Sequence, residues 1–330
     1  MKKLCLFLIL LSDSIYSFSQ YTIDSISRLE IKSIISYLSS DSLKGRGNYT
    51  VELNKAAHFI ADKFAESGLE YFPGVASYLL PFTYKKLSNN QRLIDSSGQY
   101  DPHYILQNVV GVVPGKSLAA DIIIFSAHYD HIGVGKADLK GDSIFNGAND
   151  NASGTTALLM LADYFSKRKD NNRTLIFCAF AGEELGNLGS SIFADYLKPS
   201  YIKAVINIEM IGKNNYTGKK NTFFITGSEY SNFNRIFTKA LKGSTVKIIN
   251  EPDQSKQLFQ RSDNFTFALK GIPAHTIMAS DDGESCYHKP CDDISRIDID
   301  KMTEIIKAIA VGCKTIVNGK DTPSRIYGLK

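Results

Sequence analysis

Hydrophobic and polar positions follow two alternating patterns along most of this chain. Short, continuous apolar runs are typical of strands buried on both faces, and they occur at residues 122–127, 174–180, 204–208 and 274–278. Apolar residues at helical spacing predict helices at 155–167, 232–241, 264–269 and 300–317. Further strands are expected at 109–113, 222–226 and 246–249. Strands that alternate with helices predict an α/β fold with a largely parallel sheet covered on both faces.

The chain before this alternating part is predicted to begin with helices. Apolar residues recur at helical spacing from Ile23 to Leu38 and again over residues 52–67, where Gly68 occupies a position that commonly ends a helix. Residues 71–104 are rich in Tyr, Ser and Asn, and we expect an irregular, partly β segment there. The chain shows no internal repeat, low-complexity linker or domain break, so residues 20–330 are interpreted as a single domain.

The first twenty residues differ in composition from the rest. Lys2 and Lys3 precede an apolar run over residues 4–11, and a Ser-rich stretch follows it. This three-part layout predicts a secretory signal peptide over residues 1–19, and therefore a secreted or periplasmic protein. The run is shorter than the ~20 residues that cross a bilayer, and no later run is long and apolar enough, so we expect no stable membrane span. A buried N-terminal strand or helix is the alternative.

The composition fits a globular protein with a sizeable core, since 43% of the 330 residues are hydrophobic and 22% are charged. The formal net charge of +4 is small and no basic block occurs, so nucleic-acid binding receives no support. Cys178 and Cys313 lie in apolar patterns and are expected to be buried thiols. Cys286 and Cys291 could form a local disulfide bond, which export would permit but the sequence does not decide. The oligomeric state is equally open.

Polar side chains that can bind metal ions or move protons follow the predicted strands. In open α/β sheets, ligands bind at the carboxyl ends of the strands. The strand ends and the loop before the helix at 155–167 supply two His residues and five acidic residues: His128, Asp130, Asp150, Glu183, Glu184, Glu209 and His288. Each has an ordinary alternative, such as a helix cap for Asp150 or a surface position for His288. Their joint occurrence at one edge of one sheet favours a shared site.

The residue types indicate the chemistry of that site. Neutral imidazoles and carboxylates without thiolates suit Zn²⁺ in an open, catalytic site. A carboxylate that bridges two ions, with one His and one further carboxylate on each, would make a dinuclear centre that clamps a shared water. Of the adjacent Glu183 and Glu184, one could hold metal while the other faces the water, because neighbouring side chains at a strand end point in different directions. Asp130 could accept a hydrogen bond from the His128 imidazole and fix its tautomer.

Five ordered motifs resemble those of metallopeptidase family 28, the co-catalytic dizinc aminopeptidases, whose relatives include glutamate carboxypeptidases and glutaminyl cyclases. The motifs are His128-x-Asp130, Gly147-Ala148-x-Asp150-Asn151-x-Ser153-Gly154, Gly182-Glu183-Glu184-x-Gly186, Asn207-Ile208-Glu209-Met210-Ile211-Gly212 and Tyr287-His288-x-Pro290. The resemblance extends from about Leu38 to His288. It implies a three-layer α/β/α fold with a mixed, mainly parallel central sheet, here as one zinc-peptidase catalytic domain over residues 20–330.

The resemblance also implies a set of metal ligands. Asp150 would bridge two Zn²⁺ ions. His128 and Glu209 would complete one site, and Glu184 and His288 would complete the other. Glu209 departs from the family, which usually has Asp at this position. Its side chain is one methylene longer, so the metal, the backbone or the binding mode of the carboxylate must differ there.

Two further residues receive catalytic roles from the resemblance. Glu183 would be the general base, which takes a proton from the shared water and later delivers it to the leaving amine. Tyr287 would donate a hydrogen bond to the substrate carbonyl oxygen as negative charge develops there. Simple packing of Tyr287 beside His288 is the alternative.

The leading hypothesis is a secreted zinc-dependent aminopeptidase that acts on peptides with a free N-terminus. A glutaminyl-peptide cyclase of the same fold would need one zinc ion and no hydrolytic water, and the complete ligand set with Asp130 and Asn151 favours the hydrolase. A carboxypeptidase would need positive groups for the substrate carboxylate, and the sequence assigns none. A non-catalytic binding protein on a peptidase scaffold is a further alternative, although all five ligand positions hold competent residues. Side-chain specificity and the physiological substrate stay open.

Overall fold

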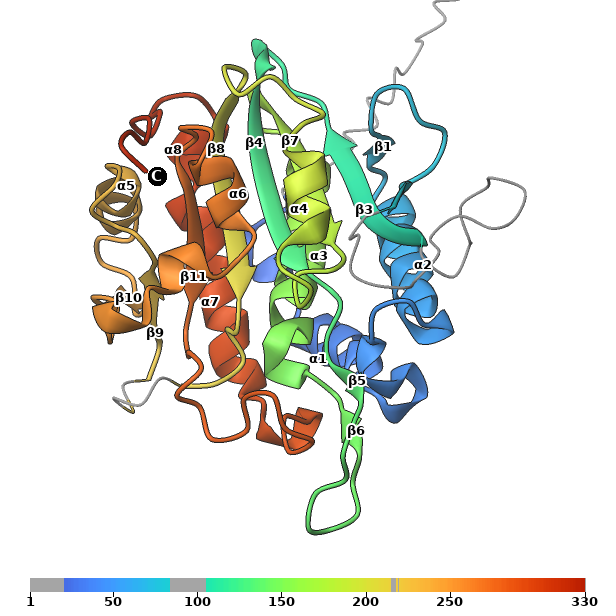
Figure 1. Cartoon of the computed structure of the whole chain (residues 1–330). Helices are drawn as coiled ribbons and strands as arrows, with labels where there is room; N and C mark the ends of the chain where they lie inside the picture. The colour runs from blue at the N-terminus through green and yellow to red at the C-terminus, as the bar shows by residue number, and fades with distance from the viewer. Residues whose placement is uncertain (1–20, 84–104, 215–217, 219, 330) are drawn as a thin grey trace, which may run out of the picture.

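The computed structural model describes residues 21–83, 105–214, 218 and 220–329 of the chain. Four parallel strands form the centre of its main sheet, and their order is β7 (Arg173–Phe180), β4 (Leu118–His128), β8 (Ile202–Glu209) and β11 (Ala274–Met278). The register pairs His128 with Phe180 and Glu209 with Met278, so the last residues of these strands meet at one edge of the sheet. In Figure 1 this is the lower edge.

Antiparallel strands extend the sheet on both sides. Beyond β7, β3 (Ile105–Val113) pairs antiparallel to β7, and β1 (Glu70–Tyr71) and β2 (Leu79–Thr83) pair antiparallel to β3. Beyond β11, β9 (Thr222–Ile225) pairs antiparallel to β11. The last strand, β10 (Lys247–Ile248), pairs parallel to β9. A separate hairpin of β5 (Gly133–Val134) and β6 (Ile144–Phe145) projects from the lower edge (Figure 1). The central sheet is mixed with a parallel centre, which confirms the predicted fold class.

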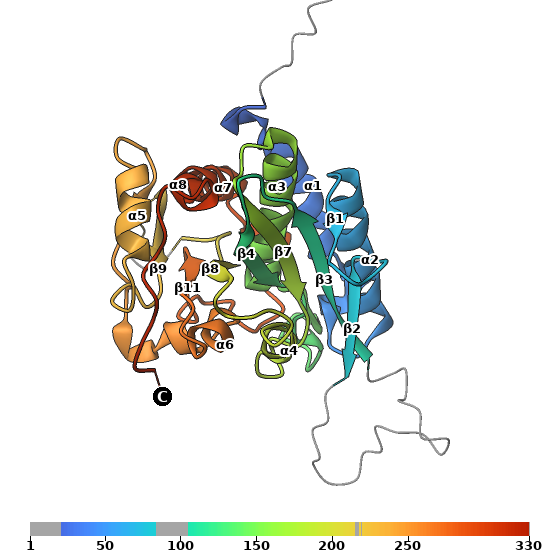
Figure 2. The ribbon, with the colours of Figure 1, turned by 90° about the horizontal axis from the view of Figure 1, so that it is seen from above.

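Helices cover both faces of the sheet and complete a three-layer arrangement (Figure 2). One face carries α1 (Arg28–Leu38), α2 (Val51–Glu66), α3 (Ser153–Arg168), α5 (Phe233–Ala240), α7 (Ile299–Gly312) and α8 (Lys314–Val317). The other face carries α4 (Leu188–Phe193) and α6 (Asn264–Ala268). The apolar core lies between these layers and the sheet, in one cluster on each face.

The sequence explains where the first helices begin and how they face. The hydroxyl oxygens of Ser27 and Thr50 accept hydrogen bonds from backbone N–H groups in the first turns of α1 and α2, over 3.3 and 3.1 Å. Both helices then turn one apolar stripe inward, as their spacing predicted. By contrast, α3 is buried almost all round, because it lies in contact with the sheet, α1, α2 and α7. The turn that precedes α3 is therefore held inside the molecule.

Some predicted elements differ from the structure. The closing helix expected over 300–317 is interrupted at Cys313, between α7 and α8. The short helix α4 and the β5–β6 hairpin were not predicted. The predicted signal peptide over residues 1–19 lies outside the described residues, as does most of the irregular segment before β3. Among the described residues, no helix is long and apolar enough to cross a membrane.

His275, on β11, makes the fold sensitive to acid. Its ring is buried and both nitrogens are engaged, Nδ1 with the Thr226 backbone oxygen (2.9 Å) and Nε2 with the Ser231 hydroxyl (2.6 Å). Burial lowers the pKa of His275 from 6.5 to about 4. The unfolded chain therefore binds more protons between these pH values, so stability is present above pH 6.5 and is lost as the pH falls towards 4.

We expect this single group to remove about 3 kcal/mol of the free energy of unfolding between pH 7 and pH 4. Urea unfolding of the metal-free protein across this range measures the effect. His275→Gln should be less stable at neutral pH but should lose less stability on acidification. Substitution of His58, an exposed residue on α2, is the control. Equal pH slopes for wild type and His275→Gln would contradict the expectation.

Candidate metal site

The structure brings the predicted site residues together from five segments of the chain. They come from the ends of β4 and β8 (His128, Glu209), the loop after β7 (Glu183, Glu184), the turn before α3 (Asp150) and a loop after β11 (Tyr287, His288). All five segments meet at the carboxyl edge of the parallel strands, which is where ligands bind in sheets of this type.

One group of candidate metal ligands consists of His128, Asp150 and Glu209, with one ligand atom of each lying within 4.8 Å of the others. His128 Nε2 lies 3.3 Å from Asp150 Oδ1. The other ring nitrogen, Nδ1, lies 3.1 Å from the Asp130 backbone oxygen, so a hydrogen on Nδ1 leaves the Nε2 lone pair facing the carboxylates. Within the described residues, buried His128 Nε2 and Glu209 Oε2 have no hydrogen-bond partner. Such unpaired atoms beside a shared carboxylate fit a bound cation.

A second group shares Asp150 and adds Glu184, His288 and His131. His288 Nε2 lies 3.1 Å from Asp150 Oδ2 and 3.4 Å from Glu184 Oε1. Asp150 therefore turns Oδ1 towards His128 and Oδ2 towards His288. A carboxylate that faces two ligand groups has the geometry that a bridging ligand requires. His131 was not among the predicted residues, although it directly follows the His128-x-Asp130 motif.

Asp130 makes different contacts from those expected. Its Oδ1 lies 3.8 Å from His128 Nδ1, beyond hydrogen-bond distance, and the backbone oxygen of Asp130 orients the imidazole instead. The carboxylate accepts hydrogen bonds from Asn48 Nδ2 (2.7 Å) and from the backbone N–H groups of Glu183 (3.2 Å) and Glu184 (3.3 Å). Asp130 thus holds the turn that carries both glutamates, and it fixes their direction relative to β4.

Distant residues hold the turn that carries Asp150. The Asp292 carboxylate accepts hydrogen bonds from the backbone N–H groups of Asn149 and Asp150, from 142 or more residues along the chain. Lys213 donates to the same carboxylate over 2.7 Å and compensates its buried charge. The Asn151 side chain donates to the β8 backbone over 3.0 Å. These contacts tie the turn to β8 and to the loop after β11, so Asp150 is positioned by the fold itself.

Arg46 is buried beside the same turn. Its guanidinium donates to four backbone oxygens, those of Leu38, Tyr129, Asn146 and Gly147. Burial lowers the pKa of Arg46 to about 10, while the carboxylates of the site act to raise it, so Arg46 remains charged at neutral pH. A fixed cation therefore lies next to the candidate ligands.

A disulfide bond between Cys286 and Cys291 closes the loop that bears Tyr287 and His288. The Tyr287 ring stacks on the His288 imidazole, with centroids 3.9 Å apart. Tyr287 also lines the cleft formed by the site carboxylates. Tyr287 therefore packs beside His288, as the alternative interpretation expected, and it also forms part of the cleft wall. Cys178 and Cys313 are buried free thiols, as predicted.

The site concentrates negative charge. Burial acts to raise the pKa of Glu184, but hydrogen bonds with two histidines outweigh it and lower that pKa to about 2. Burial, with repulsion from Asp150, raises the pKa of Glu209 to about 7. Burial and neighbouring carboxylates also raise the pKa of Glu183 well above its usual value. A divalent cation relieves this repulsion, because it takes the place of protons between the carboxylates.

Glu183 lines the cleft beside the ligand groups and belongs to neither group. The buried apolar residues Met210, Leu258 and Met278 also line the cleft. Arg261 completes the wall, where its guanidinium donates to Asp282 over 2.6 Å. The sequence does not predict Arg261 as a positive group of the site. It lies between two short helices, and no spacing or motif there relates it to the cleft.

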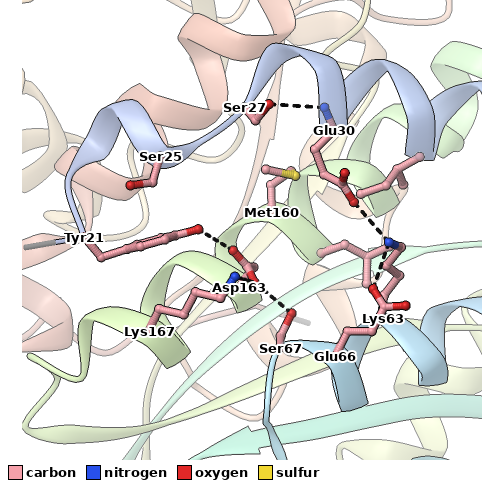
Figure 3. Close-up of a pocket in the computed structure, with 12 residues that line it drawn as sticks. Tyr21, Ser25, Ser27, Glu30, Lys63, Glu66, Ser67, Met160, Asp163 and Lys167 are labelled. Atoms are coloured by element: carbon pink, nitrogen blue, oxygen red, sulfur yellow. Dashed lines mark hydrogen bonds and ion pairs between the residues drawn. The ribbon is translucent and has the colours of Figure 1, made fainter. Parts of the chain in front are cut away.

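A different cavity, of about 450 Å³, lies near the start of the described chain, where α1, α2 and α3 meet (Figure 3). Its charged side chains are engaged with one another: Tyr21 donates to Asp163 over 2.6 Å, and Lys63 contacts Glu30 and Glu66 over 3.0 and 2.9 Å. Asp163 is ten residues along α3, about 15 Å from the helix start at the metal site. This cavity is therefore separate from the candidate site.

Fold and site together define a class of protein: a three-layer α/β/α domain with two adjacent candidate ligand groups that share one carboxylate. The donor set of imidazoles and carboxylates, without thiolates, fits Zn²⁺ with open coordination positions. The carboxylate of Glu183, which belongs to neither candidate group, lines the same cleft, and hydrolytic metal sites commonly have such a group.

Comparison with known proteins identifies the family. The sequence profile of peptidase family M28 matches residues 108–312, more than half of the chain, so the chain belongs to this family. Aminopeptidase YwaD from Bacillus subtilis (strain 168) is 27% identical over 230 residues, 67% of this chain and 47% of that protein. Aminopeptidase Y from Saccharomyces cerevisiae is 26% identical over 238 residues, 64% of this chain and 40% of that protein. The chain thus spans less than half the length of these curated relatives.

Solved structures share the fold. BSAP, a zinc aminopeptidase from Bacillus subtilis, superposes with a TM-score of 0.67 at 19% identity and covers 92% of this chain and 98% of that one. A glutaminyl cyclase from Porphyromonas gingivalis superposes with a TM-score of 0.65 at 15% identity, covering 88% and 99%. At these identities the likeness shows the fold alone, and this fold serves both kinds of enzyme.

Proposed function

We propose that this chain is a zinc-dependent aminopeptidase that hydrolyses the N-terminal peptide bond of peptides with a free N-terminus. The shared Asp150 carries the proposal, because its two oxygens face two ligand groups at the edge of one cleft. Membership of a peptidase family supports it, as do relatives named aminopeptidases and zinc metalloproteases. Two zinc ions per chain would be held by the predicted ligands, His128, Asp150, Glu184, Glu209 and His288.

Zinc bound at this site would lower the pKa of a water molecule and stabilise negative charge on the scissile carbonyl. Glu183 would move the proton, and its position in the cleft wall outside both ligand groups supports this role. The raised pKa of its carboxyl group suits a residue that takes a proton and then delivers it to the leaving amine. Burial and nearby carboxylates raise the pKa of Tyr287, so its hydroxyl stays protonated and would donate a hydrogen bond to the carbonyl oxygen.

Turnover of an aminoacyl-nitroanilide panel, coupled to elemental analysis for zinc, tests the proposed activity. We expect hydrolysis of unblocked substrates, its loss on chelation and its return with added Zn²⁺. Acylated substrates of the same sequence are the matched control and should not be cleaved. Cyclisation of glutaminyl peptides without hydrolysis would identify a cyclase instead, and turnover of acylated peptides would identify another type of peptidase.

We also propose that residues 1–19 form a signal peptide and that the catalytic domain, residues 20–330, acts outside the cytoplasm. The Cys286–Cys291 disulfide supports an oxidising compartment, since disulfides rarely persist in the cytosol. Cell fractionation followed by N-terminal sequencing measures both points. The mature chain is expected to begin near Gln20, and a cytosolic protein that retains Met1 would contradict the proposal.

A further inference from the structure

His131 is a buried histidine at the edge of the second ligand group. Its backbone N–H donates to the Arg46 backbone oxygen over 3.2 Å, and a β-bridge pairs it with Gly47. Gly147 lies against the ring: a Cβ atom added there would approach His131 Cδ2 to 2.5 Å. Both the backbone and the ring of His131 are therefore held in place by their surroundings, as a metal-ligand position requires.

The polar contacts of the His131 imidazole are all made by Nδ1. This atom lies 2.9 Å from Glu184 Oε1 and 3.8 Å from Asp150 Oδ2. The other nitrogen, Nε2, is buried and has no hydrogen-bond partner among the described residues. Of the two ring nitrogens, Nδ1 is thus the one that faces the candidate ligands.

Two imidazoles converge on the same pair of oxygen atoms. His288 Nε2 lies 3.1 Å from Asp150 Oδ2 and 3.4 Å from Glu184 Oε1, the same two atoms that His131 Nδ1 contacts. A zinc ion with four protein ligands and a water molecule would be five-coordinate, and neighbouring ligands about 2.0–2.2 Å from it would lie about 3.0–3.6 Å apart. The four contacts, at 2.9, 3.1, 3.4 and 3.8 Å, lie close to this range. His131 Nδ1 thus faces both carboxylates, as His288 Nε2 does.

We propose that His131 is a fourth protein ligand of the ion that Asp150, Glu184 and His288 hold. The two metal sites would then be unequal, because the described residues supply three protein ligands in the His128 group. The four-ligand site fills first and holds its ion more tightly than the other. This inference rests on the proposed two-ion centre and does not depend on peptidase activity.

Zinc titration of the metal-free protein against a chromophoric chelator measures the two affinities. Wild type should bind two ions in two resolved steps. His131→Ala should weaken the tighter step at least about tenfold and change the weaker step by less than about threefold. His58→Ala, at an exposed histidine on α2, is the matched control and should leave both steps unchanged. Identical affinities in His131→Ala and wild type would overturn the proposal.

Cobalt spectroscopy separates a ligand from a residue that only positions Glu184. In His131→Cys the sulfur would lie close to the place of Nδ1, because Nδ1 is the ring nitrogen nearer the backbone. One equivalent of Co²⁺ should then produce a thiolate-to-cobalt charge-transfer band that wild type lacks. The buried Cys178 and Cys313 are present in both proteins, so they do not contribute to the difference. A folded, cobalt-loaded His131→Cys protein without the band would overturn the proposal.

The wild-type protein distinguishes a failure of the His131 proposal from a failure of the proposed metal centre. If wild type binds zinc in two steps and His131→Ala binds zinc with the same two affinities as wild type, only the proposed role of His131 is wrong. If wild type binds no zinc, the proposed metal centre fails as well. Circular dichroism of each metal-free variant checks folding, and His131→Asn replaces His131→Ala in the titration if the latter does not fold.

Discussion

Replacing Glu183 with Gln is expected to lower kcat for an aminoacyl substrate by about 100- to 10,000-fold while leaving bound zinc unchanged. Gln has nearly the same shape as Glu but cannot take a proton from water and deliver it to an amine. Glu183 belongs to neither candidate ligand group, so the change should not disturb metal binding. The Asp130 carboxylate accepts from the backbone of residue 183, a contact that the substitution preserves.

The neighbouring Glu184→Gln variant is the matched control for this experiment. It makes the same chemical change one residue away, but Glu184 belongs to the second ligand group and contacts His131 and His288. We therefore expect Glu184→Gln to lose zinc, measured by elemental analysis, and Glu183→Gln to retain it. Wild-type turnover in a zinc-loaded Glu183→Gln protein would show that another group is the base.

Asp150→Asn is expected to remove both ions and reduce turnover below detection. Among the described residues, Asp150 is the one common to both ligand groups, with Oδ1 facing His128 and Oδ2 facing His288. Attraction to these two histidines outweighs the effect of burial and lowers the pKa of Asp150, so it is ionised in the native protein. The amide has no negative charge to share between two cations. Its shape is nearly the same, so the backbone hydrogen bonds from Asn149 and residue 150 to Asp292 should persist.

Zinc content after dialysis, with activity measured at saturating added zinc, tests this expectation. Asp163→Asn, on α3 but in the separate cavity, is the control and should keep both ions. Loss of one ion alone from Asp150→Asn would mean that Asp150 serves a single site. Retention of both ions would remove Asp150 from the metal centre.

The strand ends could be predicted because they depend on a local pattern. Continuous apolar runs identified the four parallel strands of the centre, and the residues that follow them, such as His128 and Glu209, meet at one edge in the structure. The side chains that hold these residues could not be predicted in the same way. Asp292 accepts from the backbone of Asp150 across 142 residues, and no local pattern relates positions so far apart.

His131 shows a different limit of prediction from sequence. His131 follows the His128-x-Asp130 motif directly. The motif already provides one histidine ligand, His128, and nothing in the sequence predicts a metal-binding role for the second histidine. The choice depends on the direction of the chain after β4, where a bridge to Gly47 turns His131 back towards the site. Likewise, the backbone oxygen of Asp130 meets the His128 ring while its carboxylate turns towards Glu183. The alternation of side chains along a strand does not predict the directions that side chains take in the turn after it.

The buried guanidinium of Arg46 is expected to keep the chain folded whether or not metal is bound. Many small zinc domains unfold without their ion, because nothing else holds the ligands together. Here a permanent cation lies beside the carboxylates, and its hydrogen bonds to the backbone of Asn146 and Gly147 hold the start of the turn that carries Asp150. The chain is therefore expected to stay folded when its ions are stripped. The supply of zinc would then control how much of the protein is active without changing how much of it is present.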